Sequence, residues 1–405
     1  MKILKGSVTA PKGFLASGVH CGLKKNKEKL DLALIYSEVS CQAAGVFTSN
    51  KVKANPIIVD KHHLEDLRAQ AIIVNSGNAN ACTGEEGLRN AYHMTKLAGN
   101  ALGIQENDVL VASTGVIGVP LKIGCIEEGI NPLVKGLSVN GHIYAREAIM
   151  TTDTIKKECA VSFKIGESTV TLGGISKGSG MIHPNMGTML GFITTDLNIT
   201  GEMLQEALKE ATKKSFNRIS VDGDESTNDS VLILANGLCN NDIIDEKNND
   251  YYEFLDALNY VCVELAKKIA KDGEGANKLI ECRVIGCECE DDGVRLAKSV
   301  VKSNLVKTAV FGSDANWGRI LCALGYSGVD FKEEQVDVSF ESSKGYIEVY
   351  KKGVPLGFSE DKAKKILEDN EITILVNMNQ GSEKAFAFGC DLSYEYVRIN
   401  GDYRT

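Results

Sequence analysis

The chain has 405 residues, of which 43% are hydrophobic and 24% charged, a composition typical of a globular protein with several domains or one large layered core. Its formal net charge of −9, with no basic stripe, argues against nucleic acid as a partner. No apolar run approaches the roughly 18 residues that cross a membrane, and the N-terminus lacks the apolar centre of a signal peptide, so we expect a cytoplasmic protein.

Twelve cysteines are scattered along the chain. In a large chain without a secretion signal, we expect them to be reduced and mostly buried. Cys282, Cys287 and Cys289 lie close together, but their spacing is not CxxC, no second pair follows and no histidine is near. We therefore expect no metal site.

Patterns typical of strands and helices alternate along the first two thirds of the chain. Residues 71–77 and 107–114 are apolar runs that end in small polar residues, as buried strands often do. Between them, residues 85–102 carry apolar side chains at helical spacing. Further on, Thr200 can cap a helix, and residues 253–271 form the clearest predicted helix, with lysines in its last turn.

The last third has a different pattern. A strand at 280–290 and a helix at 291–305 are followed by QVDVSF and YIEVYKKG, which alternate apolar and polar residues around 342–345 and predict an antiparallel hairpin. Ser359 can cap a short helix that precedes the strand EITILVNM. The chain as a whole is predicted to be an α/β protein with mixed sheets.

The stretch KGSGMIHPNMGTMLGFITTD, from Lys177 to Asp196, is the most informative part of the sequence. A glycine-rich loop leads into a predicted buried strand, and Thr188 stands at the junction, directly after Gly187. Cleavage there would make Thr188 a new N-terminus, whose hydroxyl can attack while the freed α-amine, with an ordinary pKa of about 7.7–8.0, accepts the proton. An ordinary strand threonine would not explain the glycines that crowd its approach.

This segment resembles the autoproteolysis site of the glutamate N-acetyltransferases of arginine biosynthesis, also called ornithine acetyltransferases. One departure is Gly187, where the family more often has alanine; glycine is small and permissive at a strained turn, so we expect cleavage to survive. The resemblance continues in order along nearly the whole chain, through NSGNANACTG (75–84), ASTGVIG (112–118), AIMTTDT (148–154), DGDESTND (222–229), KDGEGANK (271–278), FGSDANWGRIL (311–321) and NGDYRT (400–405).

The resemblance implies a layered sandwich of mixed sheets between helices, with a mixed α/β C-terminal part and both pieces of the cleaved chain interleaved. Cleavage before Thr188 would give an α piece, 1–187, and a β piece, 188–405. Within the β piece we expect 188–275 to complete the main α/β core and 276–405 to form the C-terminal α/β part. The family pairs cleaved protomers, so we expect two copies of each piece.

The resemblance also assigns roles to individual residues. Thr188 is the nucleophile, and Thr114 with Gly115 would supply a hydroxyl and a backbone N–H to the oxyanion. Composition alone would treat Thr114 and Gly115 as an ordinary strand-to-turn junction. Thr151 would offer a hydroxyl to the acyl or amide group.

Substrate charges would be held by two further residues. Lys177 is expected to pair with an α-carboxylate as a compact point charge, although a solvated loop lysine is an equal alternative without the resemblance. Glu274, between two glycines, would hold the ammonium of ornithine; its alternative is a surface turn. Asn400 and Thr405 match the remaining substrate contacts of the family, and VRIN (397–400) is predicted to be a strand that ties down this tail.

The reaction implied is a double displacement: Thr188 takes the acetyl group from N2-acetylornithine, releases ornithine and passes the acetyl group to glutamate. No metal or organic cofactor is implied, and acetyl-CoA is a second donor that the sequence neither requires nor excludes. One alternative is an N-terminal-nucleophile amidase or aminopeptidase, in which water attacks the acyl enzyme. Another is a non-catalytic protein that binds an anion in the glycine loop.

Overall fold

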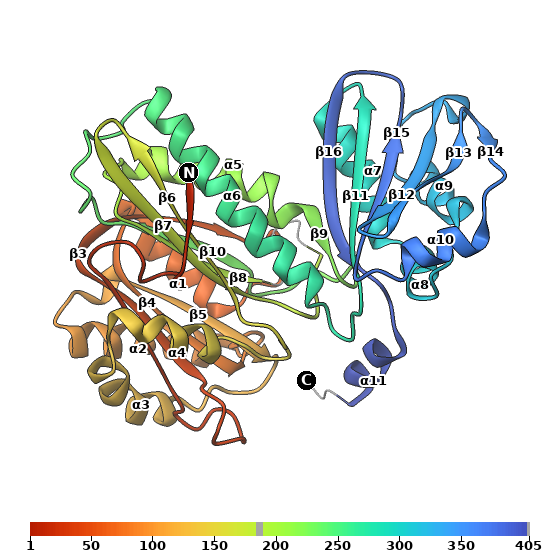
Figure 1. The fold of residues 1–405 in the computed structure, drawn as a ribbon. Coiled ribbons are helices and arrows are strands. Elements are labelled where there is room, and N and C mark those ends of the chain that lie inside the picture. The colour runs from red at the N-terminus through yellow and green to blue at the C-terminus, as the bar shows by residue number, and fades with distance from the viewer. Residues whose placement is uncertain (184–188, 403–405) are drawn as a thin grey trace.

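The computed structural model describes residues 1–183 and 189–402 (Figure 1). Over these residues it contains a nine-stranded and a seven-stranded sheet. The larger sheet has the order β1 (Lys2–Leu4), β6 (Lys157–Ile165), β7 (Ser168–Lys177), β8 (Leu190–Thr195), β10 (Ser230–Ala235), β3 (Leu32–Phe47), β4 (Arg68–Asn78) and β5 (Val109–Val116), with β2 (Phe14–Val19) paired to β3. The smaller sheet has the order β14 (Val354–Pro355), β13 (Gly345–Lys351), β12 (Asp337–Ser342), β15 (Glu371–Asn377), β11 (Leu279–Cys287), β16 (Glu383–Cys390) and β9 (Ile219–Ser220).

Helices cover the outer faces of both sheets (Figure 1). On the larger sheet they are α1 (Asn55–His63), α2 (Gly84–Leu102), α3 (Ile123–Lys135), α5 (Gly201–Lys214) and α6 (Asn249–Lys271), whereas α4 (His142–Ala148) packs Ala145 and Ala148 against the inner side of the sheet. The smaller sheet carries α7 (Glu290–Lys302), α8 (Asn304–Phe311), α9 (Trp317–Gly325) and α10 (Glu360–Leu367), and α11 (Tyr394–Asp402) follows at the end. In the part of the chain that is described, none of these helices has the length and apolar character needed to span a bilayer.

The larger sheet folds over itself, which produces the layers of a sandwich. Side chains alternate along each strand, so Ile72 and Val74 of β4 join a buried inner cluster with Leu232 and Leu234 of β10. The alternate residues point outward into separate cores, one against α5 and α6 and the other against α1, α2 and α3. The predicted layered α/β fold is confirmed.

Strands from both sides of position 188 share this sheet. β8 runs antiparallel to β7, and β10 runs antiparallel to β3. The smaller sheet also combines strands that are distant in sequence. Its strand β9, which lies between β8 and β10 along the chain, pairs with β16 near the C-terminus. The division of residues 188–405 at 275 stays a prediction.

Several predicted elements have the expected ends because local capping is satisfied. The side chains of Thr200 and Ser359 accept backbone hydrogen bonds at the starts of α5 and α10. The helix predicted at 291–305 is instead two helices, because Ser303 ends α7 and caps α8. The clearest predicted helix, α6, begins earlier than expected, where Asn248 caps it.

The strand predicted at VRIN (397–400) is wrong, because these residues belong to helix α11. The hydroxyl of Ser393 accepts the backbone N–H of Glu395 and donates to the carbonyl oxygen of Gly275, which fixes the start of the helix. In the described chain, no strand pairs with this segment. The tail is therefore held by hydrogen bonds at the start of the helix and from Asn400 to Glu274, rather than through a sheet.

Candidate active site

Six residues singled out in the sequence line one pocket, although they come from five separate segments. These are Thr114 and Gly115 at the end of β5, Thr151 in the loop before β6, Lys177 at the end of β7, Glu274 after α6 and Asn400 in α11. Gly187, Thr188 and Thr405 lie outside the described residues. Ser226 and Asn228, which sequence reasoning did not assign, line the same pocket and belong to the DGDESTND motif.

Gly115 is a position where only glycine fits. Its φ of +132° is rarely adopted by L side chains, and a Cβ there would lie 2.4 Å from the carbonyl carbon of Gly77 in β4. The close approach of these two backbones brings the end of β5 to the pocket. Thr114, the residue before Gly115, is buried there.

Lys177 is a buried cation with little pairing. Its Nζ donates to Thr114 Oγ1 at 3.3 Å, and within the described residues no carboxylate oxygen lies within 4 Å of it. Burial lowers the pKa of Lys177, while the nearby carboxylate of Asp153 favours the charged form. An ammonium held in this way has donors left for an anion in the pocket.

Glu274 presents a carboxylate to the same pocket. Its backbone N–H donates to the carbonyl oxygen of Ser179 at 2.9 Å, and Asn400 Nδ2 donates to its Oε2 at 2.8 Å. The carboxylate packs against Gly180, where a Cβ would lie 2.3 Å from the carboxyl carbon. The glycine-rich loop therefore makes room for an acidic side chain opposite Lys177.

The residue that follows Thr188 in the chain lies beside the pocket. Met189 lines a small adjoining cavity together with Thr114, Lys177 and Asp229. The backbone N–H of Met189 donates to Asp229 Oδ1 at 2.5 Å. Burial raises the pKa of Asp229 well above its usual value, although the Met189 N–H partly opposes this.

Comparison with known proteins identifies the family. A sequence model of the ArgJ family matches residues 15–405. The arginine biosynthesis bifunctional protein ArgJ 1 of Clostridium acetobutylicum is 52% identical over 406 residues, which cover 100% of this chain and 99% of that protein. The chain belongs to the ArgJ family.

Two further ArgJ proteins are also similar to this chain. That of Caldanaerobacter subterraneus subsp. tengcongensis is 51% identical over 405 residues and the full length of both chains. The crystal structure of the arginine biosynthesis bifunctional protein argJ from Bacillus halodurans is 47% identical, with a TM-score of 0.51, and covers 53% of this chain and 100% of that chain. The predicted membership of an acetyltransferase family of arginine biosynthesis is confirmed.

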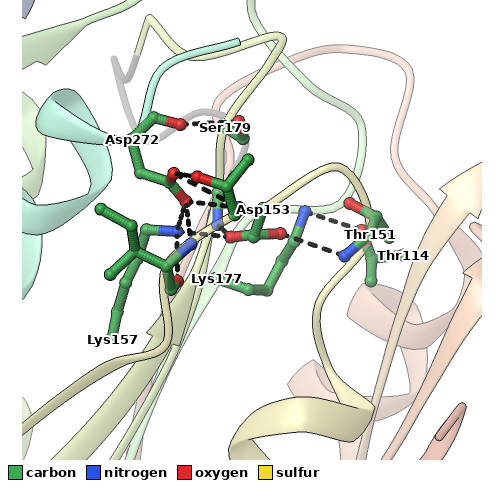
Figure 2. A network of polar contacts seen from close by, with 10 residues as sticks. Thr114, Thr151, Asp153, Lys157, Lys177, Ser179 and Asp272 are labelled. Carbon is green, nitrogen blue, oxygen red and sulfur yellow. Dashed lines mark hydrogen bonds and ion pairs between the residues drawn. The ribbon is translucent and has the colours of Figure 1, made fainter. Parts of the chain in front are cut away.

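A second group of polar residues lies next to Thr151 and Lys177 and was missed in the sequence (Figure 2). Lys157 Nζ forms ion pairs with Asp153 at 2.7 Å and with Asp272 at 2.5 Å, and all three side chains are almost completely buried. Asp153 and Asp272 stand in two of the quoted motifs, AIMTTDT and KDGEGANK. Their place in these motifs is the sequence signal that could have identified the two aspartates.

Neighbouring charges set the pKa of Asp153. Burial by itself would raise the pKa of Asp153, but Lys177 and Lys157 outweigh it and hold that pKa well below its usual value.

Among the described residues, no cluster of three or more His, Cys, Asp or Glu side chains could hold a metal ion.

Proposed function

We propose that this chain is an acetyltransferase that moves the acetyl group of N2-acetylornithine to glutamate through an acetyl ester on Thr188, giving ornithine and N-acetylglutamate. The observation that carries the proposal is the meeting of Lys177 and Glu274, two buried groups of opposite charge, in one pocket with Thr114 and Gly115. Membership of the ArgJ family supports it.

The first half-reaction begins with attack of Thr188 Oγ on the acetyl carbonyl carbon. The hydroxyl proton passes to the α-amine of Thr188, and the oxyanion accepts hydrogen bonds from the Thr114 hydroxyl and the Gly115 N–H. Because Lys177 Nζ donates to Thr114 Oγ1, the hydroxyl proton of Thr114 is free to point at the oxyanion. The tetrahedral intermediate then breaks its C–N bond, and the leaving amine of ornithine takes the proton.

In the second half-reaction, the α-amine of glutamate attacks the acetyl ester and Thr188 Oγ leaves with a proton. The charges of the pocket suit both amino acids: Lys177 would pair with an α-carboxylate, Glu274 with the side-chain ammonium of ornithine, and Thr151 with the acetyl or amide group. Asn400 would orient the Glu274 carboxylate through its amide, and we propose that Thr405 completes the contacts.

Cleavage between Gly187 and Thr188 is part of the proposal, with two α and two β pieces in the assembled enzyme. The resulting β piece would hold 218 of 405 residues, about 54% of the chain. The solved Bacillus halodurans chain is matched in full by 53% of this chain, which is close to the share that such a piece would have.

The curated relatives are called bifunctional, which supports a second activity. We propose that acetyl-CoA can load the same threonine, so that N-acetylglutamate is also made directly. The enzyme would need no metal or organic cofactor and would work in the cytoplasm.

The test is an assay of the purified protein with N2-acetylornithine and glutamate, repeated with acetyl-CoA as the donor. Formation of ornithine and N-acetylglutamate in equal amounts would support the transferase. If ornithine and free acetate accumulate at the same rate with and without glutamate, water is the acceptor and the chain is an amidase.

A further inference from the structure

We propose that Asp153, Lys157 and Asp272 form a buried positioning unit that fixes the spacing between Lys177 and Glu274, and so selects substrates by the length of their side chain (Figure 2). The inference rests on the proposed function, because it takes Lys177 and Glu274 as the groups that hold the two charges of N2-acetylornithine.

Asp153 fixes the Lys177 side of the pocket. Its Oδ1 accepts the backbone N–H of Gly178, the residue after Lys177, at 2.7 Å. Its Oδ2 accepts the backbone N–H of Thr151 at 3.0 Å. One carboxylate therefore holds two pocket segments that are distant in sequence, and any shift of Asp153 moves both.

Asp272 fixes the Glu274 side. Its carboxylate accepts the backbone N–H groups of Thr154 and Ile155, at 3.0 and 3.2 Å, and the hydroxyl of Thr154. Its carbonyl oxygen accepts the hydroxyl of Ser179 at 2.7 Å. Since Asp272 is two residues before Glu274, these bonds hold the turn that carries Glu274 against the loop that follows Lys177.

Lys157 joins the two sides, because its single ammonium bridges both carboxylates. Ser179 adds a second link between the two sides. Its hydroxyl donates to the carbonyl oxygen of Asp272, and its own carbonyl oxygen accepts the N–H of Glu274. A buried ion pair recovers little net stability after desolvation, so a stabilising role does not account for these contacts. Positioning is thus the role that these contacts favour.

The consequence concerns chain length. The α-carboxylate and the side-chain ammonium of N2-acetylornithine are a fixed number of methylenes apart, and N2-acetyllysine is one methylene longer. A site with rigidly spaced charges should discriminate between them by about tenfold or more, since one extra methylene typically changes kcat/KM by about 10- to 200-fold in a fitted pocket. Loosening the positioning unit should reduce that discrimination.

The experiment compares kcat/KM for N2-acetylornithine and N2-acetyllysine in the wild type, Ser179→Ala and Lys157→Met, with each value normalised to the folded, cleaved fraction. Ser179→Ala removes one hydroxyl, and Lys157→Met removes both ion pairs. The matched control is Ser215→Ala, which deletes an equally buried hydroxyl that bonds a backbone carbonyl of α5 at 2.6 Å.

We expect the preference for N2-acetylornithine to fall at least about fivefold in both variants and to stay unchanged in the control. If Lys157→Met does not fold, Ser179→Ala decides the outcome alone. If the wild type acts on N2-acetylornithine and Ser179→Ala has the same preference between the two substrates as the wild type, the positioning role is overturned while the proposed function stands. A wild type that does not act on N2-acetylornithine would overturn the proposed function instead, and the inference with it.

Discussion

The backbone N–H of Met189 and the carboxylate of Asp229 are joined by a 2.5 Å hydrogen bond in the buried interior. The carbonyl oxygen of Asp229 in turn accepts the N–H of Thr48 at 3.0 Å, and the next residue, Ser230, begins β10. The peptide that follows Thr188 is therefore attached to the middle of the larger sheet. The residue proposed as nucleophile is covalently bonded to one of the best-anchored points of the fold.

Removing the Asp229 carboxylate should weaken both stability and maturation. Asp229→Ala leaves the buried Met189 N–H without its acceptor, which costs about 1–3 kcal/mol of unfolding free energy. Asp229→Asn keeps an acceptor oxygen and resembles the neutral acid that burial favours, so its effect should be smaller. Denaturant unfolding and a time course of fragment formation on gels would measure both effects. An alanine variant as stable and as quickly cleaved as the wild type would refute this.

The charge on Lys177 should limit activity at alkaline pH. Burial lowers the pKa of Lys177 below the ordinary lysine value of about 10.4, so its ammonium is lost earlier as pH rises and the α-carboxylate is bound less well. In Lys177→Arg the guanidinium stays charged, so the alkaline fall in kcat/KM should move to higher pH even if the maximum is lower. If kcat/KM falls at the same alkaline pH in the wild type and in Lys177→Arg, loss of the Lys177 charge is not what limits activity there.

Glu274→Gln should affect one substrate more than the other. Loss of a charge-assisted contact of about 1.5–3 kcal/mol should lower kcat/KM for N2-acetylornithine by about 10- to 100-fold. The kinetics for glutamate, which has no side-chain cation, should change much less. The comparison variant is Asn400→Ala, which removes only the amide that bonds Glu274 Oε2. Equal losses for both substrates in Glu274→Gln would mean that Glu274 does not bind the side-chain ammonium of N2-acetylornithine.

Deletion of residues 401–405 should lower kcat/KM at least about tenfold, since small misplacements near the chemistry are costly. Helix α11 buries none of its side chains, and Asn400 reaches Glu274 from its last turn, so the helix depends on few contacts. Cleavage before Thr188 should continue, because it is intramolecular and local. Steady-state kinetics and fragment masses of the truncated enzyme provide the test, and unchanged kinetics for both substrates would show that the tail is dispensable.

Much of this arrangement could be predicted from the sequence, because local signals and ordered motifs carry it. Apolar runs ending in small polar residues identified β4 and β5, and the Thr114–Gly115 step lies where one of them ends. The family motifs then pointed to Lys177 and Glu274, which no periodicity would have brought together. Their meeting in one pocket depends on helix α6, which packs against β6 and β7 and brings Glu274 to the loop that follows Lys177.

What the sequence did not reveal depends on long-range packing. Lys157 pairs with Asp272 across 115 positions, and nothing local distinguishes this lysine from the solvated ones. Helix α11 was mistaken for a strand because Val397 and Ile399 are β-branched, whereas the hydroxyl of Ser393 starts a helix there. In both cases a tertiary partner decided the outcome.

The central claim is that Thr188 carries the acetyl group between the two substrates. The most direct measurement is the intact mass of the protein after exposure to N2-acetylornithine without an acceptor. We predict two fragments, 1–187 and 188–405, with one acetyl group on the second that disappears when glutamate is added, and a single unacetylated chain for Thr188→Ala. An unmodified 188–405 fragment that has nevertheless released ornithine, or an acetyl group on 1–187, would contradict the account.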